Sequence, residues 1–194
     1  PSFASLWLMP RLKAFAAAHP GISLSLSSSV EHSDFSVGLV DIDIRYGIPN
    51  WPHLTVKPVF NEKIMPLASP DFIAQHGIET PGDLLQVPLI QSMVSVVQWN
   101  DWFESRGISY TPTTFAYRFD RAFMTMDAAV QGLGVALEST TIGGVHLQSG
   151  RLQPVFQVPW YVPVKAHFLV YPARHGQRRE VMNFVHWIEK EVEL

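Results

Sequence analysis

The sequence predicts an α/β protein built of two lobes, and three observations support this fold class. Segments with strand patterns alternate with helical segments along all 194 residues, an order typical of mostly parallel sheets with helices on both faces. The segments gather in two clusters, up to about residue 70 and from about 80 to 163, and a last strand and helix follow a proline-rich passage. With 47% hydrophobic and 16% charged residues, the composition is that of a globular protein.

The first expected elements are a helix and a strand. Leu8, Leu12 and Phe15 are spaced by four and three residues, which places them on one helix face and predicts a helix over residues 5–18. A Pro-Gly pair then stops the helix. Residues 22–26 alternate apolar side chains with serines, the pattern of a strand with one buried face.

Turn and cap residues mark the elements that follow. Alternation over residues 41–47 predicts a strand that ends at a turn rich in Gly, Pro and Asn. Ser69-Pro70 and Thr80-Pro81 are helix starts, because Ser and Thr cap helices and Pro suits the first helical position. The expected elements are strands over 41–47, 56–60 and 63–68, and helices from 69 to 77 and from 80 to 85.

The rest of the chain continues the alternation and closes with its clearest helix. Val181, Phe184, Val185, Ile188 and Val192 recur with a period of 3.6 residues and form one apolar stripe. Before this helix we expect strands at 89–90, 114–118, 135–137 and 164–171, and helices around 99–103, 123–131 and 140–147.

Charge and composition exclude several classes of protein. Fourteen Lys and Arg against seventeen Asp and Glu give a net charge of −3, which argues against DNA or RNA as a partner of this chain alone. Cysteine is absent, so disulfides, thiolate chemistry and sulfur-bound zinc are excluded, which suits the reducing cytoplasm. No apolar run approaches the ~20 residues that cross a bilayer, and no membrane contact is expected.

Enzyme and metal signatures are missing, so we expect no catalytic residue, no metal and no cofactor. The sequence contains no G-x-S-x-G, H-E-x-x-H or phosphate-loop motif. The eight histidines are scattered and give no pair at i, i+4. His167 stands apart, since it lies within a predicted strand on the face opposite Phe168. Trp51, in a turn, is expected either to line a cleft or to cap the core.

Five motifs in a fixed order resemble the effector-binding domain of LysR-type transcriptional regulators over essentially the whole chain. The similarity is to the subgroup that contains the glycine-cleavage activator and the β-lactamase regulator, although Asp43 stands where that subgroup often has Ala. The motifs are Pro1–Leu12 with Phe15 and His19-Pro20, Gly21–Leu24, Asp41–Gly47, Pro66–Pro70 and Ala128–Leu137.

The resemblance implies a fold similar to type 2 periplasmic binding proteins, with a ligand cleft between two lobes. Residues 1–72 with 164–194 would form lobe I, and residues 73–163 lobe II. Two parts of the family pattern are absent from this chain, the DNA-binding winged helix-turn-helix and a strand just before Ser2. We therefore expect a longer native protein, which binds DNA only through its N-terminal domain.

The resemblance also implies a function and a set of site residues. A small metabolite, expected to carry a carboxylate, would bind between the lobes and change the DNA-binding geometry of the oligomer. Ser2 and Ser5 place hydroxyls at a helix start, where they would bind the ligand or where one of them would only cap the helix. Arg121 would pair with an acidic group of the ligand or only with Asp120. The expected effector-binding residues are Ser2, Ser5, Tyr46, Ser92, Met93, Arg121, Ala122 and His167.

The expected partners are a small-molecule effector and further copies of the chain, as a homodimer or homotetramer. The family implies an antiparallel dimer through the first helix and the strand over 22–26, which would also cover the exposed edge of that strand. Two alternatives remain at this point. One is a periplasmic-type solute-binding protein of the same fold, and the other is a hydrolase on an α/β scaffold.

Overall fold

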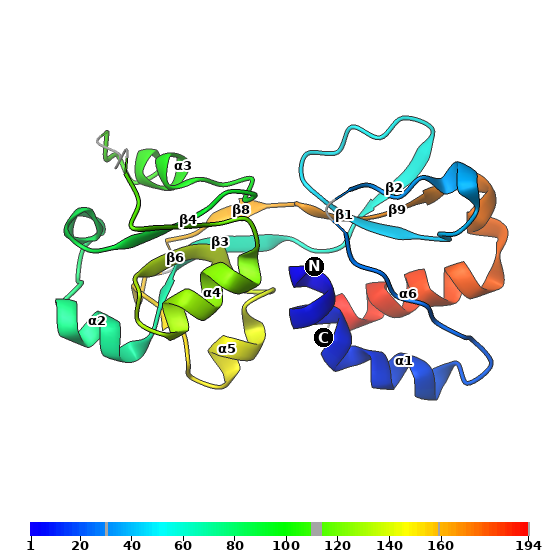
Figure 1. Cartoon of the computed structure of the whole chain (residues 1–194), viewed down its shortest axis with the longest axis horizontal. Coiled ribbons are helices and arrows are strands. Elements are labelled where there is room, and N and C mark those ends of the chain that lie inside the picture. The colour runs from blue at the N-terminus through cyan, green and yellow to red at the C-terminus, as the bar shows by residue number, and fades with distance from the viewer. Residues whose placement is uncertain (30, 110–113, 159, 194) are drawn as a thin grey trace. The chain divides into compact units, whose positions relative to one another are not determined.

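The computed structural model describes residues 1–29, 31–109, 114–158 and 160–193 (Figure 1). Their contacts divide the chain into two compact units. The first contains Pro1, Leu8–Asn61 and the chain from Lys165 onward, and the second contains Ser2–Trp7 and Glu62–Val164. The chain therefore passes from one unit to the other after residues 61 and 164, and the short segment Ser2–Trp7 near its start also belongs to the second unit. The lobe boundary expected at residue 72 lies inside a helix of the second unit, and the assignment of lobes by residue number stays a prediction.

The first unit is a three-stranded sheet with two main helices. Strand β9 is central, and β1 and β2 both pair with it in antiparallel orientation. The elements are α1 (Leu12–Ala18), β1 (Asp43–Tyr46), β2 (Leu54–Pro58), β9 (His167–Pro172) and α6 (Arg179–Glu193), with 3-10 turns at Phe35–Val37 and Ala173–Gln177. Every residue of β9 is buried, because the strand has a neighbour on each edge and packing on both faces.

The second unit holds a larger sheet of mixed orientation, in the order β5-β4-β6-β3-β7, with β8 also paired to β3. Strand β4 is parallel to β5 and β6, whereas β3 is antiparallel to β6, β7 and β8. Its strands are β3 (Glu62–Ala68), β4 (Leu89–Ser92), β5 (Tyr117–Phe119), β6 (Val135–Ser139), β7 (Gln153–Pro154) and β8 (Val162–Val164). Its helices are α2 (Pro70–His76), α3 (Trp99–Glu104), α4 (Ala122–Val130) and α5 (Gly144–Gln148), with a 3-10 turn at Pro81–Gln86.

The predicted caps form as expected. The Ser69 hydroxyl accepts a hydrogen bond from the Phe72 N–H, and Gly77 ends α2 in the left-handed conformation, which glycine adopts without a steric penalty. Thr80 starts the next turn with a reciprocal capping box to Asp83. These local signals place the two helical turns between β3 and β4.

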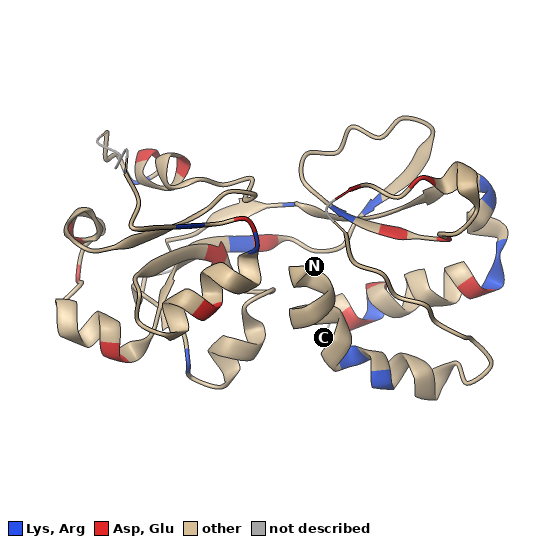
Figure 2. Cartoon of the chain, viewed as in Figure 1, with Lys and Arg blue, Asp and Glu red and all other residues tan. Residues whose placement is uncertain are grey.

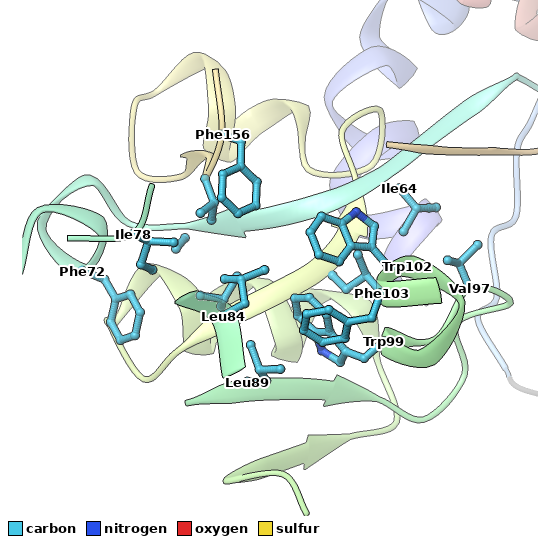
Figure 3. Packing of buried hydrophobic residues seen from close by; sticks show 14 residues of the cluster. Ile64, Phe72, Ile78, Leu84, Leu89, Val97, Trp99, Trp102, Phe103 and Phe156 are labelled. Atoms are coloured by element: carbon cyan, nitrogen blue, oxygen red, sulfur yellow. The ribbon is translucent and has the colours of Figure 1, made fainter. Parts of the chain in front are cut away.

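The core of the second unit is built around aromatic side chains of α3. Trp99, Trp102 and Phe103 are almost completely buried and contact one another through their rings (Figure 3). The indole of Trp102 stacks on Phe156 and donates a hydrogen bond to the Trp160 carbonyl at 3.0 Å. The Trp99 indole donates to the Ile90 carbonyl in β4 at 3.0 Å. Both buried N–H groups are thus satisfied, and α3 is fixed against the sheet.

A buried arginine organises one face of the first unit. The Arg45 guanidinium lies 5.7 Å from the Phe35 ring centroid and 5.4 Å from that of Trp51, and it pairs with Asp43 at 3.1 Å. Trp51 also contacts Phe168 of the core. Of the two expected positions for Trp51, the structure shows the cap on the core.

The final helix matches its predicted stripe. Four of the five expected residues are buried, and the last, Val192, is half-buried. Phe15 of α1 packs edge-on against Phe184 and contacts Trp187, so α1 and α6 share one apolar interface. The four buried stripe residues are Val181, Phe184, Val185 and Ile188.

The first helix is less regular than the spacing predicts. Residues Phe3–Leu8 form a π-helix and Met9–Arg11 a 3-10 turn, and regular α-helix begins only at Leu12. Pro10 lies in the 3-10 turn and has no N–H to donate, which explains why α-helical hydrogen bonding is interrupted there.

Two sequence expectations are wrong. Residues 22–26 form no strand, because no described segment pairs with them, and Leu24 and Leu26 are exposed. The sheets are also not mostly parallel, since both pairs in the first unit and three in the second are antiparallel. Alternation along a segment reports which side chains share a face, and it carries no information about the partner strand or its direction.

Replacement of Trp102 by Ala is expected to lower the free energy of unfolding by about 3–5 kcal/mol, because it opens a large cavity and leaves the Trp160 carbonyl without its donor. Urea unfolding followed by circular dichroism measures the change. Val158→Ala, at an exposed apolar position, should shift stability by less than about 0.5 kcal/mol. Equal losses in the two variants would contradict the assigned core.

Candidate functional site

The predicted site residues fall into two sets, one in each unit. Tyr46 and His167 belong to the first unit. The second unit contains the other six, which are Ser2, Ser5, Ser92, Met93, Arg121 and Ala122. The predicted cleft between lobes stays a prediction, and each set is described within its own unit.

In the first unit the sheet register brings Tyr46 and His167 together. Tyr46 ends β1 and lies opposite His167, the first residue of β9. Their ring centroids are 4.8 Å apart, and the Phe60 ring lies 5.6 Å from the same imidazole. His167 is buried, whereas Tyr46 is half-buried. Two residues that are 121 positions apart in the sequence therefore form one aromatic corner.

In the second unit Ser2 caps a helix that is distant in sequence. The Ser2 hydroxyl accepts a hydrogen bond from the Phe123 N–H at 3.1 Å, in the first turn of α4. Arg121 occupies the N-cap position of α4 and provides no side-chain cap of its own. Ser2 thus supplies an acceptor to the positive end of α4. Ser5, the other expected hydroxyl, is exposed.

Arg121 forms an ion pair with Asp120, one of the two pairings expected from the sequence. Its Nη1 atom lies 2.8 Å from the Asp120 carboxylate and donates to the Asp120 carbonyl at 2.7 Å. The side chain remains 26% exposed. A guanidinium has five N–H donors in a planar fork, so a pair through one nitrogen leaves others for a second acid.

Ser92 lies at the carboxyl end of β4, where the chain leaves the sheet. It is buried, but the next residue, Met93, is 58% exposed. The Ser92 carbonyl accepts hydrogen bonds from the side-chain amides of Gln91, at 2.8 Å, and Gln98, at 3.3 Å. These bonds hold the loop after β4, and they hold Ser92 at the position where open α/β sheets present ligand-binding residues.

The structure adds a buried carboxylic acid that the sequence prediction missed. Glu138 is in β6, all of whose residues are buried, and it lies near Ser92 of β4 and Thr125 of α4. The pKa of Glu138 is raised to about 8, mainly by burial and also by the charge of Glu62, although hydrogen bonding from the Ser92 and Thr125 hydroxyls opposes the rise. Glu138 is therefore mostly a neutral acid at pH 7.

A signal for Glu138 was present in the sequence. The predicted strand over 135–137 is an unbroken apolar run, and Glu138 follows it directly. The structure extends the strand to Ser139, so the carboxyl is inside the sheet rather than in a loop. Because charged side chains are rarely buried without a partner, a glutamate that continues a buried strand marks a candidate functional position.

Within the described residues, the remaining charged side chains form no further cluster that suggests a site. Among the described residues, no three His, Asp or Glu side chains are grouped as metal ligands. Lys and Arg are interspersed with Asp and Glu and do not gather along one element (Figure 2). In the described part of the chain, no helix has the length and apolar character needed to cross a membrane.

Comparisons with known proteins point to one family. The sequence profile of the LysR substrate-binding domain matches residues 1–193. An uncharacterized HTH-type transcriptional regulator of Sinorhizobium fredii, y4mQ, is 40% identical over 98% of this chain and 64% of its own length. PerR of Escherichia coli is 36% identical over 100% of the chain and 65% of its own length. The chain thus spans slightly less than two thirds of these relatives.

Solved structures agree with this result. The effector domain of AmpR from Pseudomonas aeruginosa superposes with a TM-score of 0.83 at 29% identity, over 100% of this chain and 92% of that domain. The AmpR effector-binding domain of Citrobacter freundii gives a TM-score of 0.84 at 25% identity, over 99% and 94% of the two chains.

We expect Glu138→Gln to flatten the dependence of stability on pH. The pKa of Glu138 is raised from 4.5 to about 8 in the folded protein, so the folded form retains a proton that the unfolded chain releases between these values. The stabilisation is fully present below pH 4.5 and is lost as the pH rises through about 8. Glutamine cannot ionise and removes this dependence.

Urea unfolding at pH 5, 6, 7 and 8 measures the effect of Glu138→Gln. The free energy of unfolding should fall less steeply with pH in the variant, by at most about 1.4 kcal/mol per pH unit. Glu104→Gln, at an exposed position of α3, is the matched control and should keep the slope of the wild type. An unchanged slope in Glu138→Gln would show that Glu138 is ionised in the folded protein.

Proposed function

This chain belongs to the LysR family of transcriptional regulators, whose effector-binding domain it forms, and on that premise we propose that it senses a small carboxylate-bearing metabolite. In the full-length protein, this binding would change the geometry in which the oligomer holds its DNA-binding domains. That protein would act in the cytoplasm and contact DNA through a winged helix-turn-helix N-terminal to Pro1.

The names of the relatives favour a regulator over a solute carrier. The matching proteins of Sinorhizobium and Escherichia are both named as HTH-type transcriptional regulators, and the superposed AmpR domains are titled effector domains. A periplasmic-type binding protein of similar fold is therefore the weaker alternative. The same comparisons leave a hydrolase without support.

The start of α4 is the observation that supports a carboxylate ligand. Here the Phe123 N–H is bound by Ser2, and Arg121 sits immediately before the helix. Helix N-termini favour anions because their free N–H groups and the helix dipole are positive. Arg121 adds a cation with donors to spare. A ligand carboxylate would take the acceptor role that the Ser2 hydroxyl now fills.

The other predicted residues would complete the binding surface. Ser92 and Met93 lie where β4 ends, and Ala122 is the first residue of α4. We assign Tyr46 and His167 to contacts with the remainder of the effector, through the aromatic corner of the first unit. The effector need only bind one arrangement of the protein better than another by about 1–3 kcal/mol to act as a signal.

Self-association is proposed through α1 and the segment 22–29, which forms no helix or strand. No described residues form a ladder with this segment, and Leu24 and Leu26 are 42% and 46% exposed. Backbone N–H and C=O groups outside any ladder can pair with another chain. An antiparallel homodimer would bury both leucines, and two dimers would give the homotetramer.

Arg121→Ala should weaken the response to carboxylates. In a thermal-shift screen of metabolites, a ligand at about 100 times its Kd stabilises the wild type by about 2.7 kcal/mol. Loss of the guanidinium should reduce affinity about tenfold for the acids that bind. Arg118→Ala, on the exposed face of β5, is the control and should respond like the wild type. Binding only by uncharged compounds, with no change in Arg121→Ala, would refute the carboxylate proposal.

Leu24→Asp is expected to convert the dimer into a monomer, because each copy would place a charge in the apolar interface. Sedimentation velocity of the wild type and variant measures the mass. Leu39→Asp introduces the same charge at a site that is 86% exposed in the same unit and should remain dimeric. A monomeric wild type, or dimers of all three proteins, would contradict the proposed interface.

A further inference from the structure

Two buried oxygen atoms at the end of the second-unit sheet make no well-formed hydrogen bond within the described residues. They are the Ser92 hydroxyl oxygen and Oε1 of Glu138. Ser92 is 4% exposed and Glu138 is 5% exposed. Buried polar atoms are almost always satisfied in native proteins, so two neighbouring oxygens without a well-formed hydrogen bond mark a place where a ligand could supply the donor.

The sheet register places these atoms side by side. Strands β4 and β6 are parallel neighbours, with Ile90 opposite Ala136. Two residues further along each strand, Ser92 comes opposite Glu138, and both lie at the carboxyl ends of their strands. This is the edge at which open α/β sheets bind ligands. The two oxygens thus lie at the sheet edge that also carries Met93 and leads toward the start of α4.

The groups around the Ser92 and Glu138 oxygens favour a ligand group that donates hydrogen bonds and carries a positive charge. Both oxygens can accept, and Glu62 of β3 adds a second carboxyl whose charge acts on Glu138. The other side chains that face Glu138 are neutral. They are the hydroxyls of Thr125 from α4 and Ser92 from β4. No Lys, Arg or His in the described part of the chain forms an ion pair with Glu138. A primary ammonium group brings three N–H donors and one positive charge.

We propose that Ser92 and Glu138 form a subsite for a primary ammonium group of the effector. This inference rests on the proposed function, because it assigns a second chemical group to the same ligand. Before binding, Glu138 holds a proton that avoids a buried charge. When the ammonium enters, Glu138 releases this proton to solvent and the resulting carboxylate pairs with the ammonium. An effector with both an ammonium and a carboxylate is amino-acid-like.

The first test compares amino acids with their deaminated counterparts. Each of glycine, alanine and glutamate is paired with the acid that lacks the amino group, namely acetate, propionate and glutarate. Thermal shifts of the 194-residue chain at pH 7 measure binding. We expect at least one amino acid to raise Tm while its deaminated partner does not.

The second test uses the variant Glu138→Gln with the amino acid that binds best. Its affinity should fall at least about tenfold, because a neutral amide replaces the carboxylate partner. Glu104→Gln, at an exposed position of α3, is the matched control and should bind like the wild type. Calorimetry of the wild type in two buffers with different ionisation enthalpies should show about one proton released per ligand at pH 7. This measurement needs no variant, so it tests the ammonium subsite even if Glu138→Gln fails to fold.

Several outcomes would overturn the ammonium subsite. One is an absence of any shift with the amino acids, and another is an equal shift with their deaminated partners. Amino-acid binding without proton release would show that Glu138 does not ionise to pair with the ammonium. If deaminated acids bind and respond to Arg121→Ala, the proposed effector function stands while the subsite fails. If the wider metabolite screen also gives no shift, both proposals fail.

Discussion

Burial of strand β6 on both faces is the constraint on which the candidate site depends. Val135 and Leu137 point into the cluster built around Trp99 and Trp102, whereas Glu138, one residue out of phase, lies near Thr125 of α4. A strand in the middle of a sheet has no face in water, so any polar side chain on it must be satisfied by protein or ligand. The dry environment of Glu138 follows from this position.

The two units differ in how their buried ionisable side chains are paired. Arg45 is buried with partners on several sides, since Asp43 pairs with it, the Ser33 carbonyl accepts its N–H at 3.0 Å, and two aromatic rings flank it. This arrangement is complete and serves to hold the loop before β1. Glu138 has no cation paired to it in the described residues, so its environment favours the neutral acid. A complete network supports structure, whereas an incomplete one at a strand end points to a ligand.

Several parts of the candidate site were predictable from the sequence, and others were not. Ser2 was expected at a helix start, but the helix it caps is α4, whose first turn is 121 residues away. Tyr46 and His167 were chosen separately, and only the pairing of β1 with β9 brings their rings together. Glu138 was missed because the predicted strand stopped one residue before it. Pairings between distant segments leave no mark on the local pattern that a sequence displays.

The sequence by itself determined the local elements, because caps, turns and apolar periodicity act over a few residues. Ser69 and Gly77 bound α2 as expected, and the stripe of α6 faces the core. The motifs of the sequence were also enough to indicate the LysR family. Tertiary structure decided which strands pair, in which direction they run, and which carboxyl group is buried away from solvent. Residues 22–26 alternate like a strand and form none, since a strand exists only with a partner edge, and desolvation of Glu138 likewise arises only when β4, β6 and α4 are packed together.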